Sequence, residues 1–444
     1  MRYSFTLILL LCISVGCAKL EKEKEFGNAE ISKVIGEMTE VMVNDVTNPP
    51  LASRFYAYAC LAGYEIVSQN DKAYPSLYGK INGYPEIEKP GDVGNYSYQL
   101  ASLLAMMETA AKLQPSGSII AEYQASFIDS CLNSGIAEDV VEGSLSYAKT
   151  ISTRILDYAK ADKYNQTTTY KLYTPLEEEG KWYPTPPGYF APVEPYFSSI
   201  RSFTLLSPDQ FKPVAPVAFS SDEASHFFKM MREVYVKGSG LSKENRKIAA
   251  FWDCNPFALQ DKGHLMVGMK KISPGAHWMG ITGIVVQDQN LSFPEAMKVN
   301  TIVAISLMDG FIACWDEKFR SNRIRPETAI RKHIDADWKP FLQTPPFPEY
   351  LSGHSTISTA AAEVLTHYLG ENIAFTDTVE LPYGLEARKF ESFRQAANEA
   401  AMSRLYGGIH FMDAIIKGQE QGSQLGTWII KRVEEVGEEK VAGR

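Results

Sequence analysis

Apolar residues recur with a helical period along most of the chain. Ile31, Val34, Ile35 and Met38 belong to one stripe whose members return every three or four positions, the spacing that places side chains on one face of an α-helix. Alternation typical of a half-buried strand is scarce. The pattern predicts an all-α protein with helices over 31–42, 51–67, 98–113, 118–134, 138–161, 222–236, 242–252, 294–318, 355–369, 389–405 and 410–433.

A stretch rich in proline and aromatic residues, 182–216, interrupts this pattern and cannot form regular helix. It can wrap one helical bundle on another, or it can line a pocket with aromatic rings. We favour the packing role, because a long ordered loop needs such contacts in any case. The chain is therefore expected to form two lobes, an N-terminal helical region over 30–220 and a C-terminal helical catalytic domain over 221–444.

The N-terminus has the pattern of a bacterial lipoprotein signal. Arg2 provides a positive charge, residues 5–15 are apolar but too few to span a bilayer, and small residues precede Cys17. We predict that residues 1–16 are removed, that Cys17 carries a lipid, and that 17–29 form a polar tether. An ordinary secretory signal is the alternative. The protein is expected to be exported and held by its lipid at the outer membrane or cell surface, or in the periplasm.

Composition narrows the range of partners. The 444 residues include 44 Lys and Arg against 53 Asp and Glu, a net charge of −9 at pH 7, which argues against nucleic acid as a partner. With 45% hydrophobic residues the chain can bury a large core. Four cysteines lie far apart in apolar surroundings and fit buried thiols better than a disulfide or metal framework: Cys60, Cys131, Cys254 and Cys314.

Three clusters in the last third of the chain carry candidate chemistry. In the first, Lys318 and Arg325 lie seven residues apart at the end of a helix and just beyond it, where both can converge on one anion. In the second, Ser352, Gly353 and His354 precede a helix of small residues, whose first N–H groups are a ready site for an anion. Taken singly, each cluster is better explained as a helix terminus or a cap.

The third cluster surrounds a pair of glycines. Arg404 ends one helix and His410 opens the next, with Asp413 three residues later on the same face. A carboxylate so placed can hold one imidazole nitrogen and direct the other. Considered alone, this pattern is also that of a helix break with a solvated contact between histidine and aspartate.

Together the clusters predict one oxyanion site. Lys318, Arg325 and Arg404 would surround a single point beside His354 and His410. Three cations stabilise a tetrahedral dianion and repel a divalent metal ion. We therefore reject a metal site made of the two histidines and Asp413, and expect a small anionic ligand or substrate.

The order K-x6-R-P, S-G-H and S-R-x5-H resembles the signature of the superfamily that joins type 2 phosphatidic acid phosphatases, bacterial acid phosphatases and vanadium haloperoxidases. Two positions depart from it: Leu351 stands where proline is usual, and Asp413 follows His410 by three residues where four is common. The resemblance implies the helical bundle of the vanadium chloroperoxidase and acid phosphatase type. It also implies that His354 is the general acid–base and that His410 bonds the central atom, a vanadium if vanadate is bound. The implied ligands of vanadate or phosphate are Lys318, Arg325, Ser352, Gly353 and Arg404.

Two aromatic residues and the chain length favour the haloperoxidase branch. Trp315 and Phe347 match residues that line the halide site of chloroperoxidases, although both are equally well explained as core aromatics. The resemblance therefore implies vanadate as cofactor and halide oxidation by hydrogen peroxide. The alternative is a metal-independent acid phosphatase without a cofactor, in which His410 forms a phosphohistidine and Asp413 orients it. A non-catalytic surface lipoprotein that binds glycans or supports a transporter is a further alternative.

Overall fold

The computed structural model describes residues 26–261 and 266–435. The predicted signal peptide, the Cys17 anchor and residues 17–25 of the tether lie outside these residues. The prediction that the tether continues to residue 29 is wrong, because Phe26 is buried in the core and a helix begins at Asn28. Within them the protein is helical, as the sequence predicts, and the strands form two short antiparallel pairs. The described cysteines Cys60, Cys131, Cys254 and Cys314 are buried, and they form no disulfide with one another.

Thirteen α-helices follow one another in the described residues: α1 (Asn28–Asn44), α2 (Pro49–Asn70), α3 (Tyr98–Leu113), α4 (Gly117–Asn133), α5 (Glu138–Lys160), α6 (His226–Ser239), α7 (Lys243–Phe251), α8 (Pro274–Asp288), α9 (Phe293–Ser321), α10 (Pro326–His333), α11 (Gly353–Leu369), α12 (Phe393–Tyr406) and α13 (Met412–Glu434). Short 3-10 helices are η1 (Tyr164–Thr169), η2 (Phe197–Ser199) and η3 (Leu381–Tyr383). Strand β1 (Leu259–Asp261) pairs with β2 (Met266–Gly268), and β3 (Phe375–Asp377) pairs with β4 (Arg388–Phe390).

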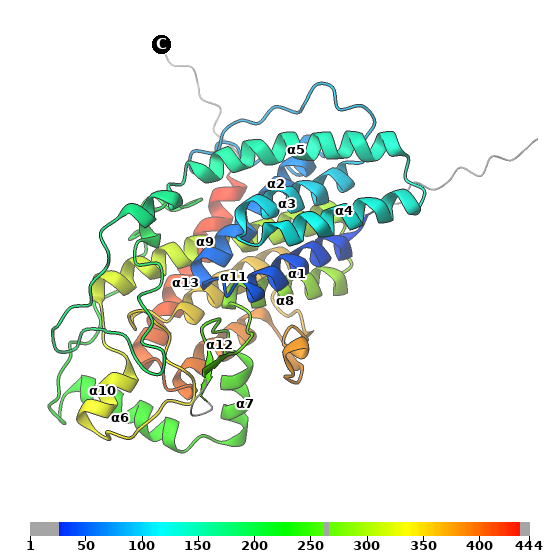
Figure 1. Cartoon of the computed structure of the whole chain (residues 1–444). Helices are drawn as coiled ribbons and strands as arrows, with labels where there is room; N and C mark the ends of the chain where they lie inside the picture. The colour runs from blue at the N-terminus through cyan, green and yellow to red at the C-terminus, as the bar shows by residue number, and fades with distance from the viewer. Residues whose placement is uncertain (1–25, 262–265, 436–444) are drawn as a thin grey trace, which may run out of the picture.

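Helix α9 forms the centre of the molecule (Figure 1). It begins at the expected capping box, in which the backbone N–H of Ser292 donates to Glu295 at 2.9 Å. Among the described helices it alone is long and apolar enough to cross a membrane, but 94% of its most apolar window is buried inside the protein. It packs against both α2 and α11. One continuous core therefore joins helices from both sides of the predicted boundary at 220.

The sequence pattern did not predict two of the observed helices, α8 and α10. Helix α8 is buried on almost every side, so its apolar residues form no stripe with polar residues opposite. Helix α10 has only eight residues, too few for a period to show. Helix α12 also begins later than expected, at Phe393, because residues 388–390 belong to β4.

The proline-rich connection packs along the C-terminal helices. The backbone N–H of Trp182 donates to the carbonyl of Asn322 at 2.9 Å. The indole N–H of Trp315 donates to the carbonyl of Val193 at 3.1 Å, and the Tyr350 hydroxyl to that of Val214 at 2.7 Å. The connection thus closes over the end of α9, where the first candidate cluster lies.

Glycines on one face of α13 allow that helix to lie directly against α11. A Cβ at Gly418 would approach the Ser352 carbonyl oxygen to 2.9 Å, and one at Gly422 would approach that of Thr356 to 2.3 Å. At Gly426 a Cβ would lie 2.7 Å from Cβ of Glu363. The spacing of four residues keeps all three glycines on one face. This contact fixes the start of α11, which carries the second cluster.

We predict that Gly422→Ala destabilises the fold by about 2 kcal/mol or more, because the obstructing atom is backbone and cannot rotate away. Exposed Gly36 in α1 has nothing within 4 Å of its would-be Cβ, so Gly36→Ala is the matched control and should raise stability by about 0.5 kcal/mol. Urea unfolding of both variants is the measurement. Equal stability of the two variants would show that α13 does not need this close approach.

Candidate functional site

The three clusters meet at one cavity because α11 packs against α9, α12 and α13. Most of the cavity's lining is apolar. The sequence-predicted residues in the lining are Trp315, Phe347, Gly353, His354, Arg404 and His410. Further lining residues are Pro49, Cys254, Asn255, Phe257, Pro274, Phe311 and Pro345.

Two buried guanidinium groups are only partly hydrogen-bonded. Arg325 donates to the carbonyls of Phe347 at 2.8 Å and Ile409 at 2.9 Å, while its Nη2 has no partner among the described residues. Arg404 donates to the carbonyl of Trp252 at 2.7 Å, and its Nε likewise has none. Burial lowers the pKa of both groups. A buried N–H without an acceptor is costly, so an anion at these atoms would be strongly stabilised.

Lys318 lies behind the cavity and holds the loop before α11. Its ammonium donates to the carbonyls of Pro348 at 3.0 Å and Glu349 at 3.1 Å, and also to that of Leu351. Burial, together with neighbouring Arg325, lowers its pKa to about 7. Lys318 therefore orders the chain that leads to Ser352, Gly353 and His354, and adds positive charge close to the cavity.

His410 is held by Glu349. Its Nδ1 lies 2.8 Å from the Glu349 carboxylate, which can only accept, so Nδ1 carries the proton. Burial lowers the pKa of His410, and Arg325 and Lys318 lower it further. The neutral ring then has a lone pair on Nε2, which accepts from Arg325 Nη1 at 3.2 Å. This nitrogen can bond an electrophilic atom once Arg325 Nη1 releases the lone pair.

His354 contributes a second neutral imidazole to the same cavity. Burial lowers its pKa, and the charge of Arg404 acts in the same direction. Its Nε2 has no hydrogen-bond partner among the described residues. A free imidazole nitrogen in the cavity wall is able to take up a proton from a bound substrate and return it.

The prediction that Asp413 holds His410 is wrong. The Asp413 carboxylate accepts two hydrogen bonds from Arg323, at 2.6 and 2.7 Å, and does not line the cavity. Asp413 lies in the first turn of α13 and turns away from the preceding histidine toward this guanidinium. Arg323 also donates to Glu349 at 2.6 Å. The carboxylate on His410 is therefore Glu349, which Arg323 connects to Asp413.

Ser352 and Gly353 have different roles, since only Gly353 lines the cavity. The Ser352 hydroxyl is the N-cap of α11, where it accepts from the Ser355 N–H at 3.2 Å and contacts the Ser355 hydroxyl at 2.8 Å. Gly353 lines the cavity, and a Cβ there would meet only the Trp315 ring, at 3.6 Å. Ser352 thus stabilises the helix start in this structure, while Gly353 keeps that start open toward the cavity.

Trp315 and Phe347 form an aromatic wall beside the cations. Their ring centroids lie 4.9 Å apart. Lys318 and Arg325 each lie 5.0 Å from the Phe347 centroid. The wall is apolar on the cavity side and close to positive charge, which suits a weakly hydrated anion.

We predict that the affinity for an oxyanion falls as the pH rises above about 7. In the protein without a bound anion Lys318 has a pKa of about 7, so it loses its proton above that pH, and an anion binds better to the protonated form. Tungstate is a suitable probe because it remains a tetrahedral dianion across this range. Calorimetric titration should show its affinity falling by up to about tenfold per pH unit. A flat profile would show that Lys318 keeps its proton.

A family model of the VCPO second helical-bundle domain matches residues 298–439. The chain is similar to the first bacterial vanadium-dependent iodoperoxidase whose crystal structure is known, with 42% identity and a TM-score of 0.86 over 93% of this chain and 98% of that one. No match was found among curated proteins.

Two further structures are similar in fold alone. The holo form of a bacterial vanadium-dependent chloroperoxidase has 15% identity and a TM-score of 0.65, over 87% of this chain and 93% of that one. The apo form of such an enzyme has 14% identity and a TM-score of 0.62, over 87% and 95%. These matches extend over both helical regions.

Proposed function

The chain belongs to the vanadium haloperoxidase superfamily, and from this premise we propose that it oxidises iodide with hydrogen peroxide, using vanadate bound in the cavity. The observation that carries the proposal is a set of three unpartnered polar atoms in and next to the cavity: Arg404 and His354 line it, and Arg325 contacts the lining residue His410. The three atoms are Arg325 Nη2, Arg404 Nε and His354 Nε2, none of which has a partner among the described residues.

These residues fit vanadate. Arg325 and Arg404 would donate to its oxygens, as would the first N–H groups of α11 from Gly353 onward. His410 would bond the central atom through Nε2, because Nδ1 is committed to Glu349. When bound, vanadate supplies the Lewis-acidic centre at which hydrogen peroxide is activated.

The chain itself supplies charge and proton control. The buried guanidinium groups of Arg325 and Arg404 stabilise negative charge without reorganisation. His354 has a pKa held below its usual range, so it is neutral near pH 7 and can accept a proton as peroxide is bound. It can return that proton as water departs.

Iodide is the halide we propose, on two grounds. The similar structure that covers nearly the whole chain is that of an iodoperoxidase. Iodide is also the largest and least strongly hydrated common halide, so it costs least to desolvate beside Trp315 and Phe347.

The test is an assay of purified protein with vanadate and hydrogen peroxide, in which iodide, bromide and chloride are compared. We expect iodide to be oxidised fastest, and phosphate to inhibit by competing with vanadate. Absence of halide oxidation by protein that has bound vanadate would overturn the proposal. Hydrolysis of an aryl phosphate by the vanadate-free protein would instead favour the phosphatase alternative.

We also propose that the protein is exported and tethered by a lipid on Cys17, on the sequence pattern alone. Cells given a labelled fatty acid should label the wild-type protein and not Cys17→Ser. Labelling of both would overturn the assignment of the anchor.

A further inference from the structure

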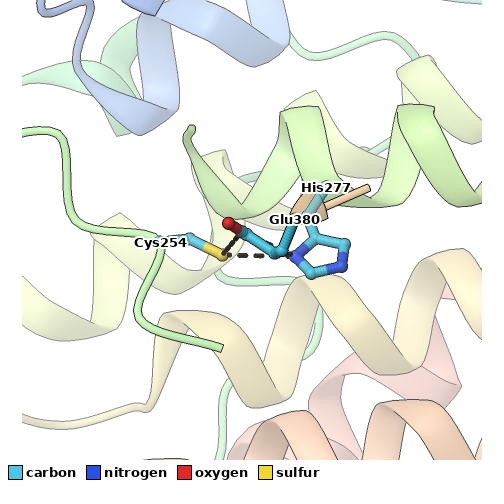
Figure 2. Close-up of side chains that lie close together, drawn as sticks. All are labelled: Cys254, His277 and Glu380. Atoms are coloured by element: carbon cyan, nitrogen blue, oxygen red, sulfur yellow. Dashed lines mark hydrogen bonds and ion pairs between the residues drawn. The ribbon is translucent and has the colours of Figure 1, made fainter. Parts of the chain in front are cut away.

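A second cluster of ligating side chains lies beside the cavity, and the proposed function does not use it. Figure 2 shows Cys254, His277 and Glu380 pointing toward one another. Cys254 follows α7, His277 lies in α8, and Glu380 precedes η3. All three are buried, and their ligand atoms lie within 4.8 Å of one another.

The three atoms form a triangle of the size that a tetrahedral zinc site requires. Cys254 Sγ lies 3.5 Å from His277 Nδ1 and 3.9 Å from Glu380 Oε1, and the latter two are 3.4 Å apart. Zinc bonds of about 2.0–2.3 Å at tetrahedral angles give ligand separations of about 3.3–3.6 Å. A cation can therefore bond all three atoms after small side-chain shifts.

His277 is already oriented as a metal ligand. Its other nitrogen, Nε2, lies 2.8 Å from the Asp377 carboxylate, the arrangement that fixes the ring of a zinc-bound histidine. The Trp252 ring stacks on the imidazole, with centroids 4.5 Å apart. Nδ1 is consequently directed at Cys254 and Glu380.

The charges around the cluster suit a divalent cation. Binding would displace one proton from the Cys254 thiol and one from His277, because Asp377, Cys254 and Glu380 outweigh burial and raise the pKa of that imidazole well above its usual value. Thiolate, Glu380 and Asp377 would then offer three negative charges around a neutral imidazole, which exceed the one positive charge of neighbouring Arg404. Thiolate, imidazole and carboxylate ligands in this combination are typical of zinc.

We propose that Cys254, His277 and Glu380 supply three ligands to a zinc ion that braces the wall of the vanadate cavity, with a water as the fourth ligand. Cys254 lines that cavity. Two residues earlier, the Trp252 carbonyl accepts from Arg404 at 2.7 Å. The ion would join this loop to α8 and to the segment after β3, and so fix the position of Arg404.

The test is metal analysis of the full chain expressed without vanadate in medium supplemented with zinc, because a buried site is filled as the protein folds. Mass spectrometry of the dialysed protein should find about one zinc per chain. Protein expressed with cobalt should absorb in the near ultraviolet through thiolate-to-metal charge transfer, and in the visible through tetrahedral bands.

Cys254→Ala and Cys60→Ala are the matched pair of variants, since each removes one fully buried thiol. We expect Cys254→Ala to lose at least about nine-tenths of the metal and the charge-transfer band, and Cys60→Ala to keep both. Glu380→Gln should retain the band but bind metal more weakly. Less than about one-tenth of a metal ion per wild-type chain, or an unchanged cobalt spectrum in folded Cys254→Ala, would overturn the proposal.

Discussion

Replacing His410 with alanine is expected to abolish both the retention of vanadate and the oxidation of iodide. In the proposed complex His410 provides the bond to the central atom through Nε2. This nitrogen carries the lone pair that accepts from Arg325 in the structure. Loss of a direct ligand should lower vanadate affinity by more than the 10- to 100-fold that typically follows removal of a residue bonded to that ligand. Vanadate titration and steady-state kinetics measure the two effects separately.

Two other histidines provide controls for this variant. His367 lies on exposed α11 surface and pairs with Glu434, so His367→Ala should leave affinity and turnover unchanged. His354→Ala should keep vanadate but lower kcat, because His354 is assigned to proton transfer. Wild-type vanadate affinity in His410→Ala would contradict the assignment of the central bond.

Replacing Glu349 with glutamine is expected to weaken vanadate binding by about 10- to 100-fold. The carboxylate can only accept, and it therefore keeps the His410 proton on Nδ1 at 2.8 Å. A glutamine amide can donate to Nδ1 and so place the proton on Nε2, where it blocks bonding. The measurement is vanadate affinity as a function of pH, together with kcat for iodide at saturating vanadate.

Asp413→Asn is the matched comparison for Glu349→Gln. Asp413 contacts Arg323 rather than His410, so the asparagine variant should bind vanadate within a few-fold of wild type and keep its pH profile. A larger loss in Asp413→Asn than in Glu349→Gln would show that the wrong carboxylate has been assigned to His410.

The spacing of apolar residues was sufficient to predict most of the helices. It failed for helices that are buried on all sides, because they have no polar face. Helix α9 was predictable because its capping box and apolar run are both local. Helix α8 was not, because a helix enclosed by neighbours has no polar face and therefore no period. Its position depends on packing against α1 and α9, which sequence spacing does not contain.

The chemistry of the site was predictable by residue type, and its supporting contacts were not. Spacing suggested that cations gather near His354 and His410. The structure has Arg325 in contact with His410 and Arg404 in the lining with both histidines, whereas Lys318 donates to backbone carbonyls. Glu349 lies 61 residues before His410, so no helical spacing connects them. Its position in the segment that leads to Ser352, Gly353 and His354 was the only available signal. Asp413 has a helical spacing from His410, but its carboxylate accepts from the guanidinium of Arg323 and does not contact the histidine.

The most direct test of the central claim is a crystal structure of the full chain grown with saturating vanadate. The account predicts one vanadate in the cavity, bonded to His410 Nε2 and hydrogen-bonded to Arg325 and Arg404. Vanadate bound at another place while this cavity holds none, or vanadate in the cavity without a bond to His410, would contradict it.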